Sequence, residues 1–270
     1  VRDRAFAGPA GQRQKGSAMT ATTPLDHAHA TMEADTNDDA ARLRFYERLA
    51  DAELFLLLSK DPEGDNISPE LFELSDHAFV LVFDTEERLS SFVGKPASYA
   101  ALSGRAIASM LAGQNIGLGV NLEVAPSSIL VPPEALSWLA QTLTHAPDEV
   151  EATPQEFTAP VGLPESLITA LDQKLSTAEG LAKFAYLVGV SYENGSKSHL
   201  LGFVDAVPQA EGALAKAVSE ALTFSGIEAG ALDVGFFTAS DPVAAQLARS
   251  GLRFDLPEPK APQEYVPVTP

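Results

Sequence analysis

Residues 116–138, IGLGVNLEVAPSSILVPPEALSW, constrain the fold more than any other stretch of the chain. They predict a strand from Ile116, a tight turn at residues 125–128, a second short strand, and a helix that opens with Pro132-Pro133, since proline is tolerated in the first helical turn. The apolar positions suit a buried pair of strands. We expect Trp138 to pack against that pair as part of the core.

Charge excludes several classes of partner. The 270 residues include 37 acidic and 18 basic ones, a net charge of −19. Residues 1–18 hold four basic residues and one acidic residue, a charge of +3, so the rest of the chain carries −22. Because affinity for nucleic acid depends on Lys and Arg that displace counterions, the composition argues against nucleic acid and against anionic lipid as partners.

The absence of cysteine excludes disulfides, thiolate-bound metals and thiolate nucleophiles. No apolar run approaches the roughly 18 residues that span a bilayer, so we expect no membrane partner. The basic start is not followed by the apolar segment of a secretory signal, and Met19 is a candidate for the true start. These features favour the cytoplasm as the compartment.

Periodicity and proline spacing predict an α/β chain of the α+β type, with two compact domains that each pack a small mixed sheet with helices. We expect a disordered polar head over residues 1–37 and a first domain over residues 38–145. A proline-rich linker follows over residues 146–163, and then a second domain over residues 164–256. Residues 257–270 are expected to form a disordered proline-rich tail.

Local signals place the elements of each domain. In the first domain we expect a helix capped near Asp38, strands at residues 53–58, 71–74 and 79–83, a helix capped by Asp84 and ended by Gly94, and a helix over residues 104–112. In the second we expect helices near residues 165–175, 214–222 and after Asp241-Pro242, with a strand at residues 232–237. The Asn194-Gly195 pair predicts a hairpin with a two-residue turn, in which Val188 faces Leu201 and Tyr186 faces Phe203.

No catalytic signature is visible. Gly117 and Gly119 do not form a dinucleotide fingerprint, because position 122 is leucine and the glycines begin a strand; close packing or a bulge explains them better. The chain lacks a P-loop, a Gly-x-Ser-x-Gly elbow and a His-Glu-x-x-His pair. We therefore expect no catalytic residue, no metal site and no cofactor.

A tentative binding set remains, formed by Asp84, Asn121, Glu123, Ser127 and Ser128. Asp84 ends a buried strand, where open sheets place binding groups, although a helix cap also explains it. Strand alternation puts Asn121 and Glu123 on one face, and such polar groups need hydrogen bonds or water. The amide either secures the turn at residues 125–128 or contacts a ligand.

Three segments resemble the N-terminal domain of the SseB (enhanced serine sensitivity) family: ELFLLLSK at 53–60, FVLVFDTEERLSSFVG at 79–94 and IGLGVNLEVAPSSILVPPEALSWLA at 116–140. Residues 160–256 resemble, more weakly, the C-terminal domain often joined to it. The resemblance implies a cytosolic α/β protein without an established activity, and the family has no agreed catalytic residues to carry over.

We therefore interpret the chain as a non-enzymatic cytoplasmic protein-interaction or regulatory module with an unknown protein partner and an unknown oligomeric state. An exposed apolar patch on the first domain would favour this interpretation. The first alternative is a small-molecule-binding or enzymatic protein, which a cleft lined by Asp84, Asn121 and Glu123 would favour. The second is a type III secretion-associated protein, a link that comes from a shared name and would require export that depends on residues 1–40.

Overall fold

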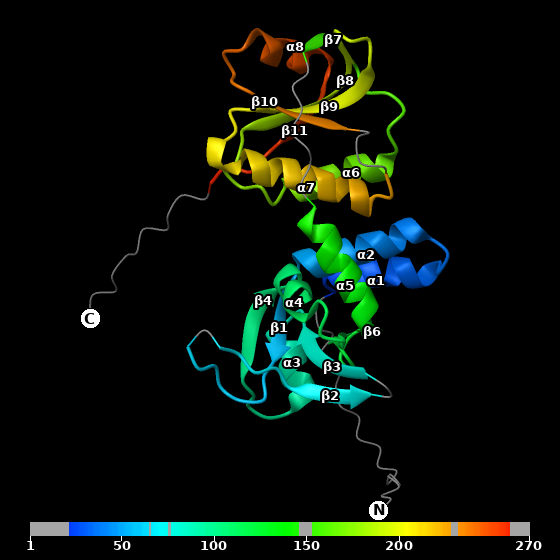
Figure 1. Cartoon of the computed structure of the whole chain (residues 1–270), viewed down its shortest axis with the longest axis vertical. Coiled ribbons are helices and arrows are strands. Elements are labelled where there is room, and N and C mark those ends of the chain that lie inside the picture. Colours follow the sequence, from blue (N-terminus) through cyan, green and yellow to red (C-terminus); the bar gives the residue numbers. More distant parts are fainter. Residues whose placement is uncertain (1–21, 65, 75–76, 146–152, 228–231, 260–270) are drawn as a thin grey trace, which may run out of the picture.

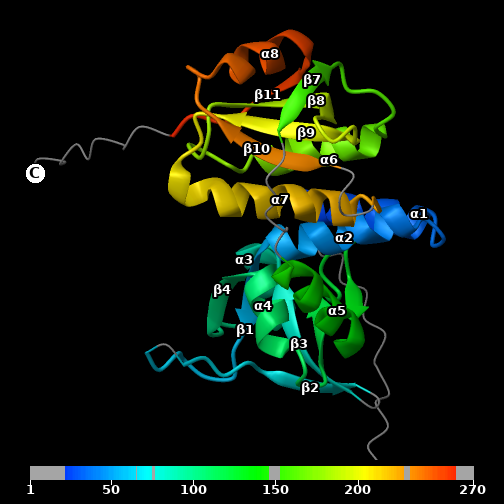
Figure 2. The same ribbon diagram turned by 45° about the horizontal axis from the view of Figure 1, so that its top comes forward.

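A computed structural model of the chain describes residues 22–64, 66–74, 77–145, 153–227 and 232–259. The chain forms two units, each built on its own mixed sheet (Figure 1). The first unit contains α1 to α5 and β1 to β6, and the second contains α6 to α8 and β7 to β11. Helices α1, α2, α6 and α7 lie between the two sheets (Figure 2). The predicted α+β class is confirmed.

The first sheet has the strand order β4-β1-β3-β5-β6, and β2 also pairs with β3. Strands β3 and β5 run parallel, whereas the other pairs are antiparallel. The strands are β1 (Glu53–Leu57), β2 (Leu71–Leu74), β3 (His77–Phe83), β4 (Tyr99–Ser103), β5 (Ile116–Val120) and β6 (Ile129–Val131).

Helices cover the two faces of this sheet unequally. The first-unit helices are α1 (Pro24–Ala34), α2 (Asp39–Asp51), α3 (Glu86–Val93), α4 (Gly104–Leu111) and α5 (Pro133–Thr144). The main core lies on one face, where alternate strand residues such as Leu54 and Leu56 pack against Phe45 of α2, Ile107 of α4 and Leu136 of α5. A smaller cluster on the opposite face packs against α3.

The second sheet has the order β10-β9-β8-β11, with β7 also paired to β8. Its strands are β7 (Pro154–Thr158), β8 (Phe184–Tyr192), β9 (Lys197–Val204), β10 (Asp233–Phe237) and β11 (Leu252–Asp255). Helices α6 (Glu165–Leu175) and α7 (Glu211–Phe224), preceded by the short 3₁₀ turn η1 (Pro208–Ala210), pack on one face. Helix α8 (Pro242–Ser250) packs on the other.

The prediction of a disordered head is wrong for residues 24–34, which form α1. Thr23 caps this helix, and a capping box joins its side chain to Asp26. Leu25 contributes to the main core. The sequence did not predict this helix, because it has no long apolar stripe. Its stability comes instead from this cap and from packing on α2. Residues 1–21 lie outside the described residues.

The predicted linker is also partly wrong, because β7 lies within it and pairs with β8. Pro154 is the first residue of this strand, a position where a missing N–H is tolerated. The rest of the predicted linker before Thr153 lies outside the described residues. In the predicted tail, residues 257–259 form no helix or strand, and residues 260–270 are not described.

The β8–β9 hairpin exists, but its predicted register is off by one residue. Leu201 pairs with Leu187, and Val188 pairs with Leu200. The cause is a three-residue loop: the N–H of Tyr192 donates to the carbonyl of Ser196, and Gly195 adopts a φ of 83°. A three-residue loop that ends in a left-handed glycine shifts the register relative to a two-residue turn.

The strand–turn–strand–helix reading of residues 116–138 is confirmed, and so is close packing at the glycines. A Cβ on Gly117 would lie 2.3 Å from the Phe79 ring, and one on Gly119 would lie 2.6 Å from Leu81. The predicted burial fails at two positions. Leu130 is 44% exposed and Trp138 is 38% exposed.

Trp138 is not part of the first-unit core, because it lies on the side of α5 that meets the second unit. Its ring makes edge-to-face contacts with Tyr46 of α2 at 5.5 Å and with Phe224 of α7 at 6.3 Å. Phe224 is fully buried and belongs to the main core of the first unit. The second unit therefore completes that core.

Candidate functional site

Asp84, the first residue after β3, belongs to a buried polar network and does not cap a helix. Thr85 is the N-cap of α3, and its side chain accepts a hydrogen bond from the backbone N–H of Arg88. The Asp84 carboxylate instead accepts from Nη1 of Arg88 at 2.7 Å and from Oγ1 of Thr23 at 2.6 Å. The cap prediction was wrong by one residue, and this shift frees the Asp84 side chain for long-range contacts.

Asn121 secures the start of the segment that leads to the turn. Its Oδ1 accepts from the backbone N–H of Asp84 at 3.1 Å, and its Nδ2 donates to Oγ of Ser127 at 2.9 Å. The Ser127 hydroxyl donates onward to Oδ1 of Asp26 at 2.5 Å. Asn121 and Ser127 are both fully buried.

The predicted alternation of Asn121 and Glu123 is wrong. Strand β5 ends at Val120, and both residues adopt left-handed backbone conformations, with φ of 50° and 61°. Glu123 is exposed, and its backbone N–H donates to the Ser128 hydroxyl at 3.3 Å. The structure therefore joins Asp84, Asn121 and Ser127 in one network and leaves Glu123 and Ser128 outside it.

Sequence reasoning missed the two residues at the centre of this network. Arg88 and Asp26 are buried, and Nη2 of Arg88 lies 2.5 Å from Oδ2 of Asp26. Arg88 follows Asp84 by four residues, a spacing that allows a contact along a helix. The capping box that starts at Thr23 was the local signal for Asp26. No local pattern links Asp26 to Arg88, which lies 62 residues away.

The charge state of Asp26 follows from these contacts. Burial alone would raise the pKa of its carboxyl, but hydrogen bonds from Arg88, Ser127 and the Thr23 N–H outweigh it and hold the pKa well below its usual value of 3.8. The network is thus an ionised, hydrogen-bonded group that attaches α1 to the sheet. Asp84, Asn121 and Ser127 therefore form hydrogen bonds that stabilise the fold.

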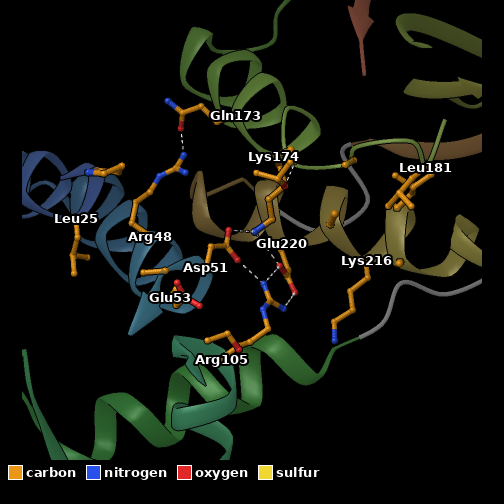
Figure 3. Close-up of a pocket in the computed structure, with 18 of the residues that line it drawn as sticks. Leu25, Arg48, Asp51, Glu53, Arg105, Gln173, Lys174, Leu181, Lys216 and Glu220 are labelled. Carbon is orange, nitrogen blue, oxygen red and sulfur yellow. Dashed lines mark hydrogen bonds and ion pairs between the residues drawn. The ribbon is translucent and has the colours of Figure 1, made fainter. Parts of the chain in front are cut away.

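A second charged cluster joins the two units (Figure 3). The Lys174 ammonium of α6 lies 2.6 Å from Asp51 of α2, 3.4 Å from Glu47 of α2 and 3.1 Å from Glu220 of α7. Arg105 of α4 bonds both Glu220 oxygens, at 3.1 and 3.2 Å, and lies 2.5 Å from Asp51. Two cations thereby neutralise two of three carboxylates.

Burial and ion pairing shift the pKa values of these groups in different directions. Burial raises the pKa of Glu47, and the nearby Lys174 offsets this only in part. Burial would lower the pKa of Lys174, but its carboxylate neighbours Asp51 and Glu47 raise it. Burial would raise the pKa of Asp51, yet Lys174 and Arg105 lower it. Lys174 and Asp51 are therefore charged at neutral pH.

A pocket of about 690 Å³ opens beside this cluster, with walls from both units (Figure 3). The first unit contributes the start of α1, the end of α2, Glu53, Asp84, Ser103 and Arg105. The second contributes residues of α6, of the segment after it and of α7. Of the five residues in the predicted set, Asp84 alone lines this pocket.

The residues that the structure describes contain no group of three or more His, Asp or Glu side chains arranged to hold a metal ion. Over those residues, every helix is too short or too polar to cross a bilayer.

Residues 25–138 match the family model for the SseB protein N-terminal domain. The match includes the whole first sheet and every member of the buried network except Thr23. No family match supports the expected resemblance of residues 160–256 to the associated C-terminal domain. The search of the curated proteins and the search of the solved structures gave no match.

Proposed function

We propose that the chain, whose residues 25–138 match the family model for the SseB protein N-terminal domain, is a non-enzymatic protein-interaction or regulatory module that acts in the cytoplasm. Its partner binds the side of the first sheet that carries Leu57, Leu81 and Phe83, which we call the α3 face. The observation that carries the proposal is the thin helical cover of this face, compared with the main core on the other face, to which α1, α2, α4 and α5 all contribute.

The α3 face presents apolar side chains that are only partly buried. Leu57, Leu81, Phe83 and Leu89 form its buried centre. Around them lie partly buried residues of the same cluster: Phe55, Phe72, Phe92, Val93, Ala97, Leu122 and Val124. Among the described residues, α3 is the helix that contributes to this cluster, and it has eight residues. Apolar surface of this kind marks sites where other proteins bind.

Two exposed side chains extend this surface to both edges of the sheet. The Tyr99 ring, 38% exposed on edge strand β4, packs edge-to-face on Phe55 at 5.5 Å. On edge strand β6, Leu130 pairs with Gly119, and a Cβ at Gly119 would touch Leu81 and Leu122. Leu130 therefore lies beside the same cluster. Large apolar and aromatic residues of this type serve as anchors in protein interfaces.

The charge of the chain indicates what partner suits this face. With a net charge of −19, the chain attracts basic proteins and repels acidic ones at long range. Glu86 at the start of α3 accepts a hydrogen bond from the Tyr99 hydroxyl at 2.7 Å, so one carboxylate borders the apolar surface directly. We propose a partner with apolar anchors surrounded by Lys or Arg.

The polar residues first considered as a site support a non-enzymatic role. Asp84, Asn121 and Ser127 are hydrogen-bonded to one another, to Arg88 or to Asp26. The small-molecule alternative called for a cleft lined by Asp84, Asn121 and Glu123, and the pocket contains only the first of these.

Matched variants test the proposal. Leu130→Asp places a charge on the α3 face, whereas Leu252→Asp changes a residue of similar exposure (40%) on edge strand β11 of the second unit. Each tagged protein is purified from native cytoplasm, and bound proteins are quantified by mass spectrometry after circular dichroism has established the fold. We expect a partner that the parent and L252D retain and L130D loses. Identical partner lists for both variants would contradict the proposal.

A further inference from the structure

The interunit pocket has the size and position of a small-molecule site. Its volume of about 690 Å³ lies within the range of roughly 300–1,000 Å³ typical of ligand pockets, which occur preferentially at junctions between folded units. None of the α3-face residues of the apolar cluster lines it, so ligand binding in this pocket is separate from the proposed partner surface.

Charged residues in the pocket are balanced, although the chain as a whole is strongly acidic. Four basic residues line it, Arg48, Arg105, Lys174 and Lys216, together with four acidic residues, Asp51, Glu53, Asp84 and Glu220. The full chain has 37 acidic and 18 basic residues. The pocket is therefore enriched in cations relative to the rest of the chain.

Two of these cations form no ion pair with a carboxylate within the described residues. Lys174 and Arg105 are neutralised by the interunit cluster. Arg48 bonds the neutral amide oxygen of Gln173, and Lys216 forms no ion pair with any described residue. Figure 3 shows Lys216 extending from α7, with no dashed line to the residues drawn. In a chain with twice as many acids as bases, such cations are available for a ligand.

Apart from Gln173 and Thr177, the remaining lining of the second unit is apolar. Around Lys216 on α7, Ala213 and Ala217 are spaced to share a helix face with Glu220, and Leu214 also lines the pocket. Ala178 and Leu181, from the segment that follows α6, complete this wall. A ligand that reaches Lys216 thus also meets a methyl-rich surface.

We propose that the interunit pocket binds a small organic monoanion, whose carboxylate pairs with Lys216 and whose apolar body packs on the Ala and Leu side chains of α7 and the segment after α6. Arg48 is the second cation available to the carboxylate. A single negative charge is favoured over two, because Glu53, Asp51 and Glu220 line the same pocket and repel further anionic charge.

Three probes test separately whether binding needs the negative charge and the apolar body of the ligand. 4-Phenylbutanoate carries the carboxylate and an apolar body, 4-phenylbutylammonium has a similar shape and the opposite charge, and inorganic phosphate has no apolar body. Each is titrated into the full chain labelled with ¹⁵N, and amide shifts are followed by NMR. We expect saturable shifts with 4-phenylbutanoate in residues 177–181 and 213–220, and weak or no shifts with the other two.

Variants then assign the site. Lys216→Gln removes the proposed anchor, and Lys95→Gln is the matched control, because Lys95 is exposed and does not line the pocket. Losing a charge-assisted hydrogen bond should raise the dissociation constant for 4-phenylbutanoate about tenfold in K216Q, with no change in K95Q. Absence of saturable shifts with 4-phenylbutanoate, equal binding of the ammonium probe, or equal affinities of the two variants would overturn the proposal. Partner capture through the α3 face is unaffected by any of these results.

Discussion

The ammonium of Lys174 lies 2.6 Å from the carboxylate of Asp51, although the two residues belong to different units and lie 123 positions apart. Lys174 is 8% exposed and is also within 4 Å of Glu47 and Glu220. Pairs that are shielded from water interact more strongly than exposed ones, but each charge depends on its partners to offset its desolvation. Lys174 is therefore a principal link between α6 and the first unit.

Replacing Lys174 with Met should lower the free energy of unfolding by about 3 kcal/mol, because it leaves buried carboxylates without their cation. The matched control is Lys183→Met, which removes an exposed pair with Asp205 and should cost less than about 1 kcal/mol. Urea unfolding followed by circular dichroism measures both. Equal stability of the two variants would show that the interunit cluster contributes little.

Asn121→Ala should lower the free energy of unfolding by about 1–3 kcal/mol, since it leaves the buried Asp84 N–H without its acceptor and removes the hydrogen bond that Nδ2 donates to Ser127. Asn121→Gly loses the same bonds but tolerates the φ of 50°. We expect the glycine variant to be the more stable of the two. If both variants unfold at the urea concentration of the parent, the network is not important for the fold.

Asp26 should make stability depend on pH in the acid range. Its pKa in the folded chain is lowered from 3.8, so the unfolded chain binds more protons there and stability rises with pH. The contribution is complete above the unfolded pKa and is lost as pH falls below about 4 toward the folded value.

The variant Asp26→Asn isolates this contribution. It should be less stable than the parent at neutral pH, and the difference should shrink as the pH falls below about 4. Urea melts at a series of pH values measure the difference, and Asp39→Asn, an exposed carboxylate at the start of α2, is the control. A constant difference between D26N and the parent across this range would contradict the assignment of an ionised, bonded Asp26.

The two units should be able to fold separately but with reduced stability. Each sheet has its own apolar clusters, which supports the predicted division between them. Phe224, however, completes the main core of the first unit, and the Lys174 ammonium lies 3.4 Å from its Glu47. We expect fragments 22–145 and 153–259 to give dispersed amide NMR spectra, and to unfold at lower urea than the whole chain. Two unfolded fragments would instead indicate a single cooperative core.

Local signals predicted most of the first unit. Asp38 caps α2 as expected, Gly94 ends α3 in a left-handed conformation, and the segment from Ile116 to α5 folds as its punctuation indicated. These features depend on neighbours a few residues apart, which sequence patterns report directly. The α3 cap failed by a single residue because Asp84 and Thr85 are both good capping residues.

The rest depends on contacts between distant segments. The pairing of Asp26 with Arg88 spans 62 residues, and that of Arg105 with Glu220 spans 115. Because residues 1–37 were expected to be disordered, Asp26 was not predicted to belong to a site, although its carboxylate is central to the network. Trp138 was expected in the core because large aromatic side chains are usually buried. Its ring instead contacts Phe224 of α7, a contact that depends on the position of the second unit.

The claim that a partner binds the α3 face is tested most directly by hydrogen exchange of the chain alone and in complex with the captured partner. Mass spectrometry resolves the exchange of peptides that cover α3, β6 and β11. The account predicts slower exchange in the complex at residues 86–93 and 129–131, with residues 252–255 unchanged. Protection confined to the second unit, with α3 and β6 unaffected, would contradict it.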